Sequence, residues 1–157
     1  MVVKIWCLAT LVLAALLMGT SFAHALEMPA KMRYDTDEWM HAQHTLYFAY
    51  ARIGGMIEIA AILAAGALAT FLHDWRPAML TAVAGAACLG VAFFVVWVPV
   101  TNRVNAHVAT WTVQAWPADW ERWRRKWEMS HLARFLLHLM GFSLLVVATL
   151  ISPLAED

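Results

Sequence analysis

Four long apolar stretches dominate the sequence, separated by shorter polar segments. They run over about residues 5–26, 45–72, 77–100 and 132–154. A helix needs about 20 apolar residues to cross the hydrocarbon core of a bilayer, and each stretch is long enough. The alternating pattern of a membrane barrel is absent, so backbone hydrogen bonding in lipid requires helices. The pattern predicts an all-α fold, a four-helix transmembrane bundle that forms a single membrane domain over residues 1–157.

The first apolar stretch also fits a secretory signal. Lys4, the apolar run and Ala23-His24-Ala25 together resemble a signal with a small-residue cleavage site. The run passes without interruption into Glu27-Met28-Pro29, which suits a helix that continues. We therefore expect residues 1–25 to be retained as the first span, with cleavage as the alternative.

The segment between the third and fourth stretches has a helical pattern of its own. Tryptophans recur at spacings of four, three and four residues, which places them on one face of a helix, and charged residues occupy the other face. The tryptophans are Trp116, Trp120, Trp123 and Trp127, and the charged residues are Glu121, Arg122, Arg124, Arg125 and Lys126. The pattern predicts an interfacial amphipathic helix over about 116–128, with its indoles at headgroup depth. A tryptophan wall for an aromatic substrate is the alternative.

Composition supports a membrane protein. Hydrophobic residues make up 62% of the chain and charged residues 14%, whereas a typical soluble domain is about 45–50% apolar and about 25% charged. Eleven basic residues balance eleven acidic ones, so no net charge attracts nucleic acid. The two cysteines, Cys7 and Cys88, lie in apolar runs and are interpreted as small buried hydrophobes.

The distribution of basic residues predicts the orientation. The loops at residues 28–41 and 101–130 share one side of the bundle and carry most of the Lys and Arg. The positive-inside rule then places these two loops in the cytoplasm and both termini outside, in the inner membrane of a bacterium.

Ionisable and other polar residues gather at the helix ends on that same side. Such residues are expensive in a membrane and usually functional. The group comprises His24-x-x-Glu27, His44, Tyr47, Asn102, Glu128-x-x-His131, Arg134 and His138. Glu58 lies 14 residues beyond His44, or about 21 Å along a straight helix, so it joins the group only if the helix is distorted at Gly54-Gly55.

Two of these pairs have the spacing used in carboxylate-bridged metal sites. A Glu and a His three residues apart lie on one face of a bundle helix, where they can hold a metal ion. The predicted metal ligands are His24, Glu27, His44, Glu58, Glu128 and His131, and imidazole with carboxylate suits Fe, Cu, Mn or Zn. The alternatives are a metal-free acid–base site, a haem held by His44 and His131, and a buried polar network. In the network, Glu27 pairs with Arg134 and Glu128 with Arg124, and the histidines contact backbone carbonyls.

Three segments carry a family resemblance. They are Leu26-Glu27-Met28-Pro29, Val98-Pro99-Val100-Thr101-Asn102 and Trp127-Glu128-x-x-His131-x-x-Arg134. Together they resemble the four-helix membrane family known as DUF1772, which includes the anthrone oxygenases of aromatic polyketide pathways. The resemblance covers about residues 10–152 and supports fold better than function. Many anthrone-oxygenase-like members have Asn where this chain has His131.

The resemblance implies a small membrane oxygenase or oxidoreductase that acts on a lipophilic aromatic or quinone-like substrate. The predicted catalytic residues are Arg134, Asn102 and Tyr47, with Arg134 and Asn102 stabilising an oxyanion. In the version without a metal or other cofactor, a His or Glu removes a proton from an activated carbon, and the carbanion reacts directly with dioxygen.

Two other functions stay open. One is a non-catalytic structural or accessory subunit, either as a homo-oligomer or in a larger membrane complex, since small residues let helices pack closely. The glycines that suggest this are Gly54, Gly55, Gly66, Gly85 and Gly90. The other is a metal or proton carrier, which requires a polar stripe across the whole bilayer.

Overall fold

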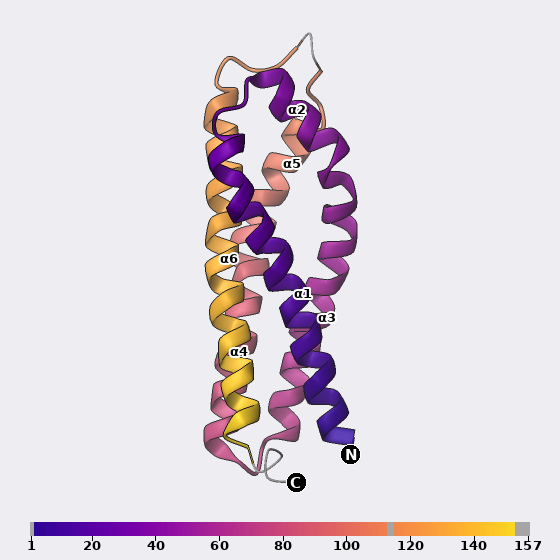
Figure 1. The fold of residues 1–157 in the computed structure, drawn as a ribbon, viewed down its shortest axis with the longest axis vertical. Coiled ribbons are helices and arrows are strands. Elements are labelled where there is room, and N and C mark those ends of the chain that lie inside the picture. Colours follow the sequence, from indigo (N-terminus) through magenta and orange to yellow (C-terminus); the bar gives the residue numbers. More distant parts are fainter. Residues whose placement is uncertain (1, 113–114, 153–157) are drawn as a thin grey trace.

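The computed structural model describes residues 2–112 and 115–152, and this part of the chain is all-α, as predicted (Figure 1). The elements in chain order are α1 (Val2–Lys31), α2 (Thr36–Thr45), α3 (Tyr47–Phe71), α4 (Arg76–Val91), the π-helix η1 (Ala92–Thr101), α5 (Asn102–Val108) and α6 (Trp120–Leu150).

Four of the helical segments are long and apolar enough to cross a membrane. They are Val2–Lys31, Tyr50–Phe71, Arg76–Val108 and Trp120–Leu150. The third contains α4, η1 and α5 in succession without a break. These segments correspond to the four predicted spans, and they make the chain an integral membrane protein by helix length and composition.

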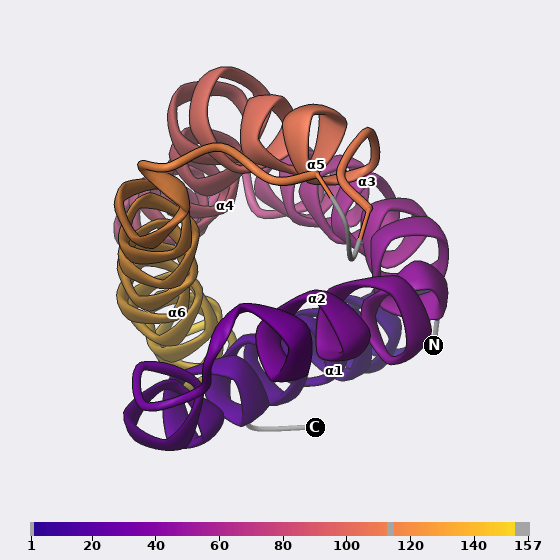
Figure 2. The same ribbon diagram turned by 90° about the horizontal axis from the view of Figure 1, so that it is seen from above.

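The long helices form a ring (Figure 2). α1 packs against α3 and α6, and α4 packs against the same two helices from the opposite side. α2 and α5 lie at one end of the bundle, and the connection from α3 to α4 lies at the other (Figure 1). We call the end that contains α2 the α2 end and the other the α4 end.

The half of the bundle toward the α4 end is closed and apolar. Its core consists largely of Ala and Leu side chains from all four long helices, including Leu17, Ala61, Leu68, Ala82, Leu89, Leu145 and Ala148. Gly85 of α4 and Gly141 of α6 let these helices approach closely: a Cβ at Gly85 would lie 2.9 Å from Leu145 Cγ and 3.1 Å from the Gly141 carbonyl oxygen. Gly85 therefore packs inside the chain, not against a partner.

Toward the α2 end the helices part. α3 packs against α4, but its contacts with η1 and α5 are few. A second, aromatic cluster covers this end, built from Trp39, Met40, Trp111 and Trp127 with neighbouring residues. α2 carries the first two of these residues, and Asp35 and Glu38 start it with a reciprocal capping box.

The third span changes helix type midway. Pro99 has no backbone N–H to continue an α-helical ladder, and η1 surrounds it as a ten-residue π-helix. The Asn102 N–H bonds to the Trp97 carbonyl five residues earlier. π-Helical turns occur frequently at functional sites.

The prediction of a separate interfacial helix over 116–128 is wrong. α6 begins at Trp120 and continues unbroken to Leu150, because no proline or glycine interrupts it before Gly141. Its first turns face the protein: Arg124, Trp127 and Glu128 are buried. The separate short helix is α2 instead, which begins in the segment predicted as a polar loop, residues 28–41, and runs on to Thr45.

Candidate functional site

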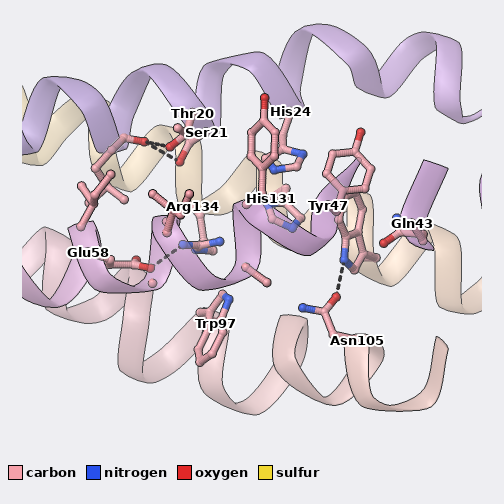
Figure 3. Close-up of a pocket in the computed structure, with 18 of the residues that line it drawn as sticks. Thr20, Ser21, His24, Gln43, Tyr47, Glu58, Trp97, Asn105, His131 and Arg134 are labelled. Carbon is pink, nitrogen blue, oxygen red and sulfur yellow. Dashed lines mark hydrogen bonds and ion pairs between the residues drawn. The ribbon is translucent and has the colours of Figure 1, made fainter. Parts of the chain in front are cut away.

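A cavity of about 560 Å³ lies inside the bundle where the helices part. Its walls come from α1, α2, α3, η1, α5 and α6, and many of the lining side chains are aromatic or polar (Figure 3). The residues that matter for its chemistry are Ser21, His24, Gln43, His44, Tyr47, Tyr50, Glu58, Trp97, Asn105, Trp127, His131 and Arg134.

Two buried imidazoles face each other in this cavity. The ring centroids of His24 on α1 and His131 on α6 are 4.1 Å apart, and the His131 ring also lies 4.1 Å from that of Trp127. The Nδ1 atoms of both histidines are buried and have no hydrogen-bond partner among the described residues. A buried nitrogen without a partner is costly, which makes this pair a candidate for binding or proton transfer.

A lysine lies between two carboxylates above the imidazole pair. Lys31 Nζ is 3.4 Å from Glu27 Oε2 and 3.2 Å from Glu128 Oε2. The Tyr47 hydroxyl donates to Glu27 Oε2 at 2.5 Å, and the Trp39 indole N–H donates to Glu128 at 3.5 Å. Burial, together with the hydrogen bond to Glu27, raises the pKa of Tyr47. Tyr47 is therefore a neutral donor at the wall of the cavity.

A second polar cluster lies deeper in the bundle. Arg134 Nη2 is 2.6 Å from Glu58 Oε2, and His138 Nε2 is 3.1 Å from Glu58 Oε1. The Ser21 hydroxyl lies 2.6 Å from His138 Nδ1. In the described part of the chain, the closed apolar core follows beyond Ser21 and His138, so this polar stripe does not continue to the α4 end. That geometry speaks against a carrier.

Asn105, not Asn102, contributes an amide to the cavity. The Trp127 indole N–H donates to Asn105 Oδ1 at 2.8 Å. Because the oxygen of the amide is taken, its NH₂ group is the part left to donate to a ligand. Asn102 is exposed and does not line the cavity, so the structure does not place this predicted catalytic residue at the site.

The cavity reaches the lipid-facing surface beside α3. Ile53 lines the cavity, yet 60% of its surface is exposed. Tyr50 and Ala51 likewise line it and are exposed. α3 makes few contacts with η1 on this side. The cavity is therefore open at the surface beside α3.

The structure does not gather the six predicted metal ligands. His24, Glu27 and His131 lie close together, with His24 Nδ1 4.0 Å from Glu27 Oε2. Glu128 and Glu58 pair with Lys31 and Arg134. His44 Nε2 contacts the Val108 carbonyl at 3.2 Å. Within residues 2–112 and 115–152, no three His, Cys, Asp or Glu side chains are grouped to hold a metal ion.

In the polar network that we considered from sequence, His44 contacts a backbone carbonyl as predicted, but both predicted ion pairs are wrong. Glu27 and Glu128 share Lys31, whereas Arg134 pairs with Glu58. Arg124 donates to the backbone carbonyls of Lys31 and Tyr34. The network therefore ties α6 to the end of α1 through both side chains and backbone.

Sequence reasoning missed Lys31, Ser21 and Trp97. Helical spacing could have identified the first two. Lys31 follows Glu27 by four residues and Ser21 precedes His24 by three, so these residues share one face of α1. Trp97 carried no such signal, because its direction depends on the π-helix.

Comparisons with known proteins identify no relative. No family model matches the chain, no curated protein is similar to it at a significant level, and the same holds for the solved structures. The class is therefore structural: an all-α protein with four helices apolar enough to cross a membrane, and a cavity inside the bundle that contains a cluster of polar side chains.

Proposed function

We propose that this protein is a membrane oxidoreductase that binds a lipophilic aromatic or quinone-like molecule in its cavity and oxidises it with dioxygen, without a metal. The observation that carries the proposal is the pair of buried Nδ1 atoms of His24 and His131, unpartnered among the described residues, beside the guanidinium of Arg134. The sequence resemblance to the family that includes the anthrone oxygenases implies the same class of reaction, although many of those members have Asn at the position of His131.

The imidazole pair is the proposed base. A neutral imidazole accepts a proton through its bare nitrogen, and neither Nδ1 atom has a hydrogen-bond partner in the part of the chain that the structure describes. Positioned bases of this kind contribute about 10²–10⁴-fold to rate. The contact with Trp127 holds the His131 ring at the cavity wall.

Arg134 is the proposed oxyanion stabiliser. Its Nη2 atom is held by Glu58, while its Nε is buried and has no acceptor among the described residues. Removal of a proton from a carbon next to a carbonyl leaves an enolate, whose oxygen accepts from such a donor. Asn105 supplies a further donor through its NH₂ group, because its Oδ1 accepts from Trp127.

The atoms balance without a further co-reactant. The base takes one proton from the activated CH₂ group, and the carbanion adds dioxygen to form a peroxide anion. Protonation gives a hydroperoxide, which loses water and leaves a ketone. The net change is one CH₂ and one O₂ converted to one C=O and one H₂O.

Charge pairing favours the version without a metal. Each of the carboxylates Glu27, Glu58 and Glu128 already has a cationic partner, Lys31 or Arg134. Lys31 Nζ occupies the position between two carboxylates where a bridging metal ion would otherwise balance their charge. Buried charges need such partners: Lys31 supplies one for the buried Glu128, whereas the Glu27 side chain is 42% exposed.

The test is oxygen uptake by the purified protein in liposomes, with anthrone as the probe. We expect His131→Gln to lower turnover by about 100-fold or more, while His41→Gln, at an exposed position of α2, leaves it unchanged. Stoichiometric Fe, Cu, Mn or Zn in active protein would overturn the metal-free version. No turnover and no binding of anthrone or simple quinones would overturn the proposal.

We further propose the inner membrane of a bacterium, with the α2 end on the cytoplasmic side. Arg33, Arg122, Arg125 and Lys126 lie at that end, and the last three are exposed, as the positive-inside rule requires. A cysteine introduced at Arg125 is then protected from a membrane-impermeant thiol reagent in intact cells and labelled after lysis.

An accessory subunit is the second candidate. Gly66 lies on the exposed side of α3, and a Cβ there would meet no atom within 4 Å. A small residue on a lipid-facing surface lets another helix approach. Two results together would favour this candidate. The protein would purify gently with a stoichiometric partner that is lost with Gly66→Leu, and His131→Gln would function fully in cells.

A further inference from the structure

Three helices bring a serine, a histidine and a glutamate into one chain of contacts at the deep end of the cavity. Ser21 Oγ on α1 lies 2.6 Å from His138 Nδ1 on α6, and His138 Nε2 lies 3.1 Å from Glu58 Oε1 on α3. Ser21 and Glu58 both line the cavity (Figure 3). A nucleophile in contact with a base, which a third group orients, is the arrangement of an activated nucleophile.

The contacts determine which atom donates to which. An ionised carboxylate only accepts hydrogen bonds, so His138 Nε2 carries a proton and donates to Glu58. In a neutral ring, Nδ1 is then the acceptor, and the Ser21 hydroxyl donates to it. The Leu17 carbonyl lies 3.0 Å from the same hydroxyl, but the hydroxyl has only one proton, and the shorter contact is to the histidine.

The charges in the cluster favour that neutral ring. Arg134 already neutralises Glu58 through a 2.6 Å contact. Glu58 and His138 are both fully buried. A protonated His138 would add an uncompensated positive charge to this enclosed site, which is expensive. Arg134 thus supplies the counter-charge to the Glu58 carboxylate, and a neutral His138 is left to accept the serine proton.

We propose that Ser21, His138 and Glu58 form an acyl-accepting triad for a lipophilic carboxylic ester that enters the cavity from the bilayer. The two ring nitrogens of His138 exchange the roles they have in serine proteases, where Nε2 faces the serine. The buried Arg134 Nε, which has no acceptor among the described residues, supplies a donor for the oxyanion. This activity goes beyond the proposed oxidation and does not depend on it.

Bond formation and proton transfer are coupled in this step. Ser21 Oγ forms a bond to the carbonyl carbon of the ester while its proton passes to His138 Nδ1. When the tetrahedral intermediate collapses, the bond to the alkoxide breaks and His138 returns the proton to the leaving oxygen. The products are an alcohol and an acyl-Ser21, which water then hydrolyses to the acid and free Ser21.

The experiment uses a lipophilic fluorophosphonate on the full chain in detergent. This probe forms an Oγ–P bond with an activated serine and releases fluoride. We expect one adduct, located on Ser21 by peptide mass spectrometry and absent from Ser21→Ala. His138→Gln slows labelling by at least about 100-fold, because the base is lost.

A buried serine without a histidine provides the control. Ser130 is buried on α6 and contacts Thr101 and the Trp127 carbonyl. We expect Ser130→Ala to label at the wild-type rate. Thermal unfolding of Ser21→Ala should match that of the wild type, which would show that this variant loses labelling because the nucleophile is removed and not because the protein is unfolded. An unlabelled wild-type protein, an adduct on another residue, or equal labelling of His138→Gln would each overturn the proposal.

Discussion

The two halves of the bundle are made by the same four spans, yet one half is closely packed and apolar and the other encloses a cavity with polar side chains. Toward the α4 end, Ala, Leu and Gly bring the helices together, and Gly85 and Gly141 leave no room for a side chain between α4 and α6. Toward the α2 end, α3 moves away from η1, and the space is lined by imidazole, guanidinium and aromatic groups.

This contrast shows how a small membrane protein keeps a site without losing its fold. In lipid there is little hydrophobic drive for helices to associate, so close packing of small residues supplies much of the attraction. The closed half provides that packing. The open half is held from within by ion pairs that cross between helices, Lys31–Glu128 and Arg134–Glu58, and so can contain polar groups that would be unstable elsewhere.

The largest effect is expected in the open half, from removal of one member of its deepest ion pair. Glu58→Ala leaves the Arg134 guanidinium buried without a counter-charge. We expect a loss of about 3–5 kcal/mol in the free energy of unfolding, measured by denaturation in mixed micelles. The double variant Glu58→Leu/Arg134→Met should recover most of that loss, and a single variant that loses less than about 1 kcal/mol would contradict the pairing.

The closed half is tested by adding one methyl group. A Cβ at Gly141 would lie 2.9 Å from Leu89 Cδ2 and 3.1 Å from the Gly85 carbonyl oxygen. Because backbone must shift, we expect Gly141→Ala to destabilise the protein by about 1–3 kcal/mol. Gly66→Ala, with open space around its Cβ, is the matched control and should be neutral or stabilise by up to about 1 kcal/mol.

Filling the open half should change binding rather than stability. Gly54 lines the cavity, and nothing lies within 4 Å of the position that a Cβ would take there. We expect Gly54→Leu to weaken binding of a lipophilic aromatic ligand about tenfold, or about 1.4 kcal/mol. Binding is measured by quenching of tryptophan fluorescence, and the same substitution at Gly66 should leave the affinity unchanged. Equal effects at both glycines would place the ligand elsewhere.

The smallest effect concerns the helix that covers the open half. Asp35 accepts from the Glu38 backbone N–H and so caps α2. Asp35→Ala should cost about 1 kcal/mol, seen as faster hydrogen exchange over α2 while the four spans keep their protection. Asp37→Ala, in the same turn but outside the cap, should cost less. Faster exchange throughout the bundle would show that α2 is not a separate unit.

Most of the fold followed from the apolar pattern, because length and continuous hydrophobicity determine spans directly. The pattern also placed His24, His131, Tyr47 and Arg134 at one end, and the structure lines one cavity with these four residues. Helix ends, in contrast, were predicted poorly. The end of α1 continues past Pro29 to Lys31, and that extension carries the lysine that pairs with Glu27 and Glu128.

The choice of ion-pair partners could not be predicted from sequence. Glu27, Glu58 and Glu128 each had several basic residues within reach of some arrangement of helices. Which one pairs depends on the rotation of each helix about its own axis. The distinction between Asn102 and Asn105 is of the same kind, since both follow Pro99 and only one faces inward.

That last distinction follows from η1. A π-helix bonds each residue to the fifth one before it and therefore winds more slowly than the α-helices on either side. Each residue of an α-helix advances the rotation about the helix axis by about 100°, and each residue of a π-helix advances it by less. The ten residues of η1 therefore change the direction in which the side chains of α5 point relative to those of α4. The face that α4 turns to the closed half and the face that α5 turns to the open half are therefore set separately. Gly85 thus faces α6 for tight contact, while Asn105, twenty residues later, turns its amide toward the cavity.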